Sequence, residues 1–165
     1  MTDPLSSLVP AESLVAALRE AGHTVATAES LTAGLLAATI AGVPGASHVL
    51  RGGVIVYATD LKTDLAGVDP AVLDADGPVA ASTAEQLAVG ASSRCGADWG
   101  VGLTGVAGPD MQDGHPVGTV FLALAGPTGS EVIRLQLDGN RWEIRMGAVA
   151  AAVSELMHRV RVASR

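Results

Sequence analysis

The chain has 165 residues, of which 48% are hydrophobic and only 2% aromatic, and its formal net charge at pH 7 is -7. This length suits a single domain whose core is built from Ala, Val, Leu and Ile with little ring stacking. The acidic charge excludes a broad basic face for duplex nucleic acid, because such binding needs clustered Lys and Arg to replace counterions.

The first third of the chain predicts a helix, a strand and a second helix. Apolar residues recur at helical spacing over 10–21, and Gly22 suits the end of that helix. A short strand over 24–28 follows, and after a turn comes an apolar helix over 34–42, which Pro44 ends.

The middle of the chain predicts one strand and two helices. The run 53–57 is rich in β-branched residues, which is typical of a buried strand. A short helix is expected over 59–66. Ser82 and Glu85 have the spacing of a capping box, which predicts the start of a helix that ends at Cys95.

The last third predicts a strand over 99–104, a glycine-containing loop over 105–116, a hairpin of strands 118–125 and 131–137, and a helix to about 160 that Asn140 caps. This order of elements implies an α/β fold, a three-layer α/β/α sandwich with a mixed, mostly parallel sheet. Ligands of such sheets bind beyond the carboxyl ends of the strands. The segments 29–34, 57–62 and 104–109 leave strands there, and we expect them to converge.

Ser30 is the candidate nucleophile of this edge. It ends a strand just before a helix, where unpaired N–H groups and the positive end of the helix dipole stabilise an oxyanion. A serine at such a junction suits nucleophilic attack. The alternative is that Ser30 only caps helix 34–42.

A serine nucleophile needs a base, and Lys62 is the candidate. Of the four histidines, only His115 lies in a segment that leaves a strand at this edge, and it is at the far end of its loop. Lys62 is the single lysine beside nine arginines, and lysine acts as a base when burial or a nearby cation lowers its pKa. Tyr57 can orient Lys62 or stack on a substrate ring. The alternatives are a solvated helix lysine and a strand-end tyrosine with a hydrated hydroxyl.

Two features of the sequence suit the binding of a phosphate group. The loop 103–109 resembles a phosphate-cradling loop in composition, although it lacks the Gly-Lys-Ser/Thr of a P-loop. Arg141 and Arg145 are four residues apart on a helix and share a face, which suits a phosphate clamp and equally suits ion pairs or packing. The spacing of His, Cys and carboxylates predicts no metal site, and we expect no cofactor.

Several motifs, in the same order along the chain, resemble those of the CinA C-terminal domain family. They are Thr-Ala-Glu-Ser-Leu-Thr-Ala-Gly at 27–34, the segments 43–47, 52–57, 65–68, 104–109 and 116–120, and the residues Lys62, Arg141, Ile144 and Arg145. The resemblance runs from about residue 5 to the end of the chain. It identifies residues 1–165 as one domain of the stand-alone form of the family.

The resemblance implies a nicotinamide-nucleotide amidase that converts nicotinamide mononucleotide into nicotinic acid mononucleotide and ammonia. The family works without a metal, by a serine nucleophile with a lysine base. Carried onto this chain, the roles are Ser30 as nucleophile, Lys62 as base and Tyr57 as its helper. The implied substrate-binding residues are Thr32, Ala33, Gly34, Thr104, Gly105, Ala107, Gly108, Arg141 and Arg145. The family also implies an α/β/α sandwich and a homodimer or higher homo-oligomer.

The chain departs from the family pattern in four places. Leu31 and Ala33 stand where Cys and Gly are common, Ala80 where Ser is usual, and Asn140 where Asp is common. The methyl group of Ala33 would lie near the oxyanion and reduce or redirect activity. Two other functions therefore stay open: a catalytically silent nucleotide-binding or interaction module of the competence/damage-inducible type, and a hydrolase of another amide.

Cellular location is inferred from what the N-terminal residues and the cysteines suggest. The first 13 residues lack the basic start and long apolar stretch of a signal peptide. Cys95 is the only cysteine, so no intramolecular disulfide can form. Apolar runs such as 145–153 are shorter than the roughly 20 residues that span a bilayer. We expect a cytoplasmic protein with a small nucleotide substrate and no membrane or nucleic-acid partner.

Overall fold

A mixed five-stranded sheet forms the centre of the computed structural model, which describes residues 3–164. The strands are β1 (Val25–Glu29), β2 (Leu50–Ile55), β3 (Trp99–Gly105), β4 (Thr119–Gly126) and β5 (Gly129–Gln136), in the spatial order β2-β1-β3-β4-β5. β2, β1 and β3 are parallel neighbours, whereas β4 is antiparallel to β3 and to β5. Four of the five strands therefore run in one direction, as the sequence predicts.

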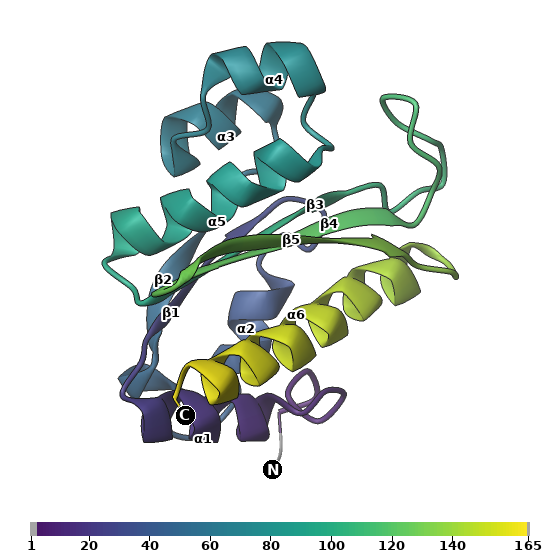
Figure 1. Ribbon diagram of the computed structural model, residues 1–165. Helices are drawn as coiled ribbons and strands as arrows, with labels where there is room; N and C mark the ends of the chain where they lie inside the picture. Colours follow the sequence, from purple (N-terminus) through teal and green to yellow (C-terminus); the bar gives the residue numbers. More distant parts are fainter. Residues whose placement is uncertain (1–2, 165) are drawn as a thin grey trace.

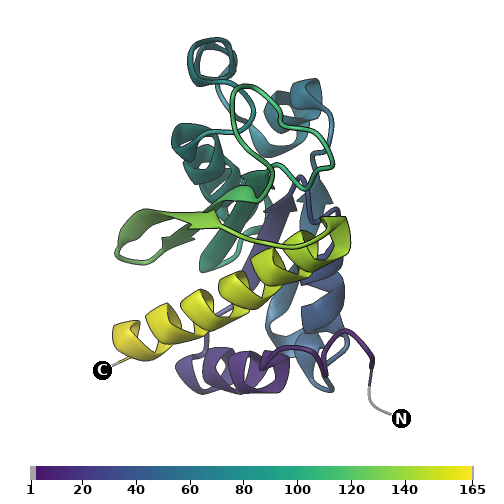
Figure 2. The ribbon, with the colours of Figure 1, turned by 90° about the vertical axis from the view of Figure 1, so that its right-hand side faces the viewer.

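Helices cover both faces of this sheet (Figure 1; Figure 2). They are α1 (Ala11–Ala21), α2 (Leu35–Ala41), α3 (Thr59–Ala66), α4 (Pro70–Asp76), α5 (Ala81–Cys95) and α6 (Arg141–Ala163), with a short 3-10 turn, η1 (Ala46–His48). Figure 1 shows α3, α4 and α5 on one side of the sheet and α1, α2 and α6 on the other. The predicted three-layer α/β/α sandwich is thus confirmed. Within residues 3–164, no helix combines the length and the apolar character that a bilayer crossing requires.

Small side chains let the helices lie close to the sheet. On one face, Leu, Val, Ile and Ala of α1, α2 and α6 pack against the aliphatic residues of the strands. On the other face, α5 lies against two glycines of β3. A Cβ atom at Gly100 would stand 1.9 Å from the carbonyl oxygen of Ala88, and one at Gly102 would stand 2.3 Å from that of Ala84. Only glycine permits this approach of helix backbone to strand backbone.

β2 differs from its prediction as a buried strand over 53–57. It covers Leu50–Ile55 and lies at an edge of the sheet, with β1 as its single strand neighbour. Its residues alternate between half-buried and exposed, and Ile55 is 51% exposed. The β-branched run identified a strand, but it did not distinguish an edge strand from a central one. Val56 and Tyr57 instead begin the connection to α3.

The predicted capping box at the start of α5 does not form. The helix begins after Ala80, which has no side-chain capping bond, and the Oγ of Ser82 donates to the carboxylate of Asp76 at 2.6 Å. The Glu85 carboxylate accepts a hydrogen bond from the Ser130 hydroxyl instead. Both polar side chains are therefore used by neighbouring elements.

α4 and α6 both begin with a side-chain N-cap, of which only the one at α6 was predicted from the sequence. Asp69 accepts a hydrogen bond from the amide of Ala71 and begins α4, a helix that was not predicted from the sequence. At the start of α6 the predicted Asn140 cap is present, as a full capping box with Glu143.

Candidate active site

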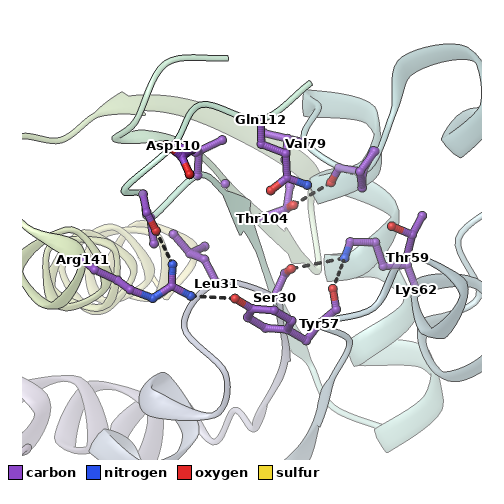
Figure 3. A pocket seen from close by; sticks show the side chains of 15 residues that line it. Ser30, Leu31, Tyr57, Thr59, Lys62, Val79, Thr104, Asp110, Gln112 and Arg141 are labelled. Carbon is purple, nitrogen blue, oxygen red and sulfur yellow. Dashed lines mark hydrogen bonds between the residues drawn. The ribbon is translucent and has the colours of Figure 1, made fainter. Parts of the chain in front are cut away.

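The three segments predicted to converge do meet in one pocket, beyond the carboxyl ends of β1, β2 and β3 (Figure 3). They meet because these strands are parallel neighbours and so end at the same edge of the sheet. Eight of the predicted site residues line the pocket: Ser30, Tyr57, Lys62, Thr104, Gly105, Ala107, Gly108 and Arg141. Thr32, Ala33, Gly34 and Arg145 are not among its lining residues.

Lys62 lies in hydrogen-bonding contact with Ser30. The side chain comes from α3, and its Nζ is 3.2 Å from the Oγ of Ser30, 2.8 Å from the carbonyl oxygen of Val56 and 3.3 Å from that of Tyr57. Lys62 is only 2% exposed. Burial lowers its pKa from 10.5 to about 8, since desolvation disfavours the charged amine.

The three contacts of Nζ suit both forms of the amine, and the ammonium form donates to the Oγ of Ser30 and to the carbonyl oxygens of Val56 and Tyr57. A neutral lysine has two N–H groups and one lone pair, and the carbonyl groups of Val56 and Tyr57 can accept both N–H groups. The lone pair is then left for the hydroxyl proton of Ser30. A lysine held in this way can remove a proton from serine, which is the role of a general base.

Tyr57 contacts Lys62 through its backbone and Arg141 through its side chain. Its ring is largely exposed, and its hydroxyl oxygen accepts a hydrogen bond from Arg141 Nη2 at 2.7 Å. Arg141 also donates, through Nη1, to the carbonyl oxygen of Gly108. Arg141 therefore links the segment after β2 to the loop after β3 at one side of the pocket, as Figure 3 shows.

The turn after β1 is held by Glu29. This carboxylate is completely buried and accepts from the amides of Gly34 at 3.1 Å, Leu36 at 3.0 Å and Ala37 at 2.9 Å. The amides at the start of α2, which were expected to stabilise an oxyanion next to Ser30, are thus already paired. Ser30 does not cap this helix either, because its N-cap residue is Gly34 and no side-chain cap bond forms.

The turn also contains the residues Thr32, Ala33 and Gly34 that were expected to bind substrate. Thr32 is completely buried, and its Oγ1 has no hydrogen-bond partner among residues 3–164. Ala33 and Gly34 both have left-handed backbones, with φ of 49° and 91°. Glycine adopts this conformation freely, whereas alanine is strained in it.

Arg145 supports the same turn from α6. Its Nε donates to the carbonyl oxygen of Leu31 at 2.9 Å, and its Nη2 donates to that of Thr32 at 3.2 Å. The two arginines that were expected to share one phosphate-binding face are therefore engaged differently. Arg141 lines the pocket, while the guanidinium group of Arg145 is occupied by the backbone of the turn.

Seven further residues line the pocket that sequence reasoning did not single out: Leu31, Thr59, Pro78, Val79, Val106, Asp110 and Gln112. Asp110 and Gln112 lie in the predicted glycine-containing loop, so their location was foreseeable although their contact with the pocket was not. Nothing in the sequence around Pro78 predicted that this residue would line the pocket. It reaches the pocket because the Oγ1 of Thr104 donates to its carbonyl oxygen at 2.6 Å. Across the part of the chain that the structure describes, no group of three His, Cys, Asp or Glu side chains is arranged to hold a metal ion.

Comparison with known proteins relates this chain to the CinA family. The family model of the CinA C-terminal domain matches residues 9–160. A CinA-like protein of Frankia casuarinae is 48% identical over 130 residues, which cover 79% of this chain and 30% of that protein. A putative competence-damage inducible protein of Shouchella clausii is 47% identical over 133 residues, covering 80% of this chain and 32% of its own length. The chain thus spans about a third of the curated relatives it matches.

Solved structures share the whole fold. The competence/damage inducible protein CihA from Agrobacterium tumefaciens superposes with a TM-score of 0.87 at 34% identity, covering 93% of this chain and 94% of the other. A CinA superfamily protein from Klebsiella pneumoniae gives a TM-score of 0.91 at 25% identity, covering 97% and 99%. In these two proteins the similarity therefore extends over nearly the full length of both chains.

Proposed function

Because the chain belongs to the CinA C-terminal domain family, we propose that it is an amidohydrolase that converts nicotinamide mononucleotide into nicotinic acid mononucleotide and ammonia. The observation that carries this proposal is the contact between Ser30 and Lys62. A buried amine with a lowered pKa stands 3.2 Å from a serine hydroxyl inside a pocket. This pair supplies the nucleophile and the base that an amide hydrolysis needs.

The first half of the reaction follows from this geometry. Neutral Lys62 removes the hydroxyl proton of Ser30 as Oγ attacks the carboxamide carbon. The resulting tetrahedral intermediate carries its negative charge on the former carbonyl oxygen. The ammonium form of Lys62 then gives its proton to the amide nitrogen, which leaves as ammonia, and an ester on Ser30 remains.

The second half regenerates the enzyme. Lys62 is again neutral once ammonia has taken the proton, so it can activate a water molecule against the ester. Hydrolysis returns the carboxylate product and the free hydroxyl of Ser30. The carbonyl groups of Val56 and Tyr57 keep Nζ in place in both halves, because they accept from either form of the amine.

Arg141 is the proposed ligand of the substrate phosphate. It is the arginine that lines the pocket, and Figure 3 shows it across the pocket from Lys62. Its present acceptors, the hydroxyl oxygen of Tyr57 and the carbonyl oxygen of Gly108, are uncharged. A phosphate is a stronger acceptor for a guanidinium group, so a nucleotide can displace these contacts. Tyr57 therefore positions Arg141 before the nucleotide binds, and afterwards its side chain is free to contact the substrate ring or phosphate.

The direct test is to incubate the purified protein with nicotinamide mononucleotide and to measure ammonia and nicotinic acid mononucleotide. The proposal expects both products in equal amounts and no requirement for added metal. Binding of the nucleotide without any turnover would contradict it and favour a silent nucleotide-binding module. Turnover restricted to other amides would show that the reaction type is right and the substrate wrong.

A further inference from the structure

Among residues 3–164, two charged side chains are almost completely buried: Lys62, which contacts Ser30, and Glu29, which precedes Ser30 in the sequence. Lys62 is accounted for by the proposed mechanism, but Glu29, which is 0% exposed, has no role in it. A carboxylate is rarely buried unless hydrogen bonds stabilise its charge, and here three amides of one turn and the following helix do so. This arrangement ties the residue before the nucleophile to the structure after it.

The bonds of Glu29 define the shape of the Ser30–Gly34 turn. Its Oε2 accepts from the amides of Gly34 and Leu36, and its Oε1 accepts from that of Ala37. The chain must therefore fold back within five residues, which is where Ala33 and Gly34 adopt left-handed backbones. A strained residue persists only where its surroundings hold it in place, and Glu29 does this from one side.

Arg145 holds the other side of the turn. Glu29 accepts from amides after the turn, while Arg145 donates to the carbonyl groups of Leu31 and Thr32 within it. Because the amides of Gly34, Leu36 and Ala37 are paired with Glu29, they are not free to stabilise an oxyanion next to Ser30.

We propose that Glu29 is a positioning residue: its carboxylate holds the Ser30–Gly34 turn against α2, so that the hydroxyl of Ser30 faces Lys62. This inference rests on the proposed function for its use in catalysis. Its structural basis, the position of the Ser30 hydroxyl, can be tested without the substrate.

The test compares the wild type with Glu29→Gln, a change that keeps the size of the side chain and removes its charge. The amide nitrogen of Gln cannot accept, so at least one of the three N–H groups must face another donor. The control is Ile40→Val, which removes one buried methyl group from α2 and leaves the carboxylate of Glu29 in place. Circular dichroism and Tm confirm the fold of each variant.

Two rates are measured. The first is the modification of Ser30 by phenylmethylsulfonyl fluoride, which forms a sulfonate ester on Oγ with loss of fluoride and is located by mass spectrometry. The second is the hydrolysis of nicotinamide mononucleotide, separated into kcat and KM. Glu29→Gln should lower the modification rate and kcat at least tenfold and change KM less than threefold, whereas Ile40→Val should leave both rates within twofold of the wild type.

The outcomes separate this inference from the proposed function. Glu29→Gln with wild-type modification and kcat overturns the inference, and so does an equal loss in Ile40→Val. If the wild type is modified at Ser30 but releases no ammonia, the proposed substrate is wrong while the modification rates still decide the role of Glu29. If the wild type is neither modified nor active, both proposals fail. Where it is active but unmodified, kcat alone decides.

A second variant covers the case in which Glu29→Gln does not fold. Arg145→Lys weakens the other side of the turn without touching any amide of α2, because a single ammonium group cannot reproduce the two-point donation of a guanidinium. It should lower kcat and the modification rate with KM unchanged. A raised KM with unchanged kcat would instead make Arg145 a phosphate ligand and would overturn its part in holding the turn.

Discussion

Replacing Lys62 by Met should remove a pH dependence of stability that the wild type shows and that follows from the lowered pKa of Lys62. Burial lowers the pKa of Lys62 from 10.5 to about 8, so the unfolded chain binds a proton more tightly than the folded one. The free energy of unfolding therefore rises with pH between these two values, where the unfolded chain carries more protons. Below pH 8 both states are protonated, and the full destabilisation by the buried ammonium is present. Met has a similar length and no charge, so it removes this effect.

The magnitude follows from the shift. A fall in pKa from 10.5 to about 8 corresponds to about 3 kcal/mol of destabilisation at pH 7. By pH 10 most of it is gone, and linkage gives a change of about 2 to 3 kcal/mol between pH 7 and pH 10. The hydrogen bonds that Met cannot make to Val56, Tyr57 and Ser30 lower its stability at every pH, so they do not affect this change.

The assay is urea unfolding of the wild type and Lys62→Met at pH 7 and pH 10. The difference in unfolding free energy between the Met variant and the wild type, whatever its value at pH 7, should fall by about 2 to 3 kcal/mol over that range. Because Lys62 is the only lysine, 13C-lysine labelling gives one NMR signal whose titration reports the folded pKa directly. A difference in stability that does not change with pH, together with a titration near 10.5, would refute the lowered pKa and with it the lysine base.

Three further predictions concern activity. Ser30→Ala should abolish ammonia release and leave Tm nearly unchanged, since only a hydroxyl is lost; turnover above a few per cent of the wild type would exclude Ser30 as nucleophile. Lys62→Arg should lower kcat at least about 100-fold, because a guanidinium group is not deprotonated in proteins; turnover by this variant near the wild-type rate would make Lys62 a binding residue only. The kcat/KM of the wild type should rise with pH through about 8, the pKa of Lys62. Arg141→Ala should raise KM for nicotinamide mononucleotide but not for nicotinamide, and equal kcat/KM for the two substrates in the wild type would show that no phosphate site operates.

The location of the site could be predicted because it depends on the direction of the strands. Apolar or β-branched runs in the sequence predicted β1, β2 and β3. Ser30, Lys62 and Thr104 lie at or after the ends of these runs. Parallel neighbours end at one edge, so their following segments had to meet. The unusual usage of one lysine among nine arginines then singled out Lys62, and its contact with Ser30 agrees with that choice.

The partners of individual side chains could not be predicted, because they depend on distances between elements. Glu29 stood in the same motif as Ser30, but nothing in the spacing indicates that its carboxylate turns back onto α2. Arg141 and Arg145 were equivalent by helical periodicity, yet α6 crosses the molecule so that Arg141 reaches the pocket and Arg145 reaches the turn. Periodicity gives the face of a helix, while the crossing of helix and loop decides which residue on that face meets which partner.

The burial of Lys62 lowers the stability of the folded chain. The core is otherwise aliphatic, and burying a lysine amine in it destabilises the folded chain. Glu29 can offset its own burial by accepting three hydrogen bonds from amides, but Lys62 has uncharged acceptors and, within residues 3–164, no carboxylate in hydrogen-bonding contact with its amine. A carboxylate there would stabilise the ammonium, restore an ordinary pKa and remove the base. The same absence of a counter-charge that weakens the fold is therefore what lets Lys62 take a proton from Ser30 near neutral pH.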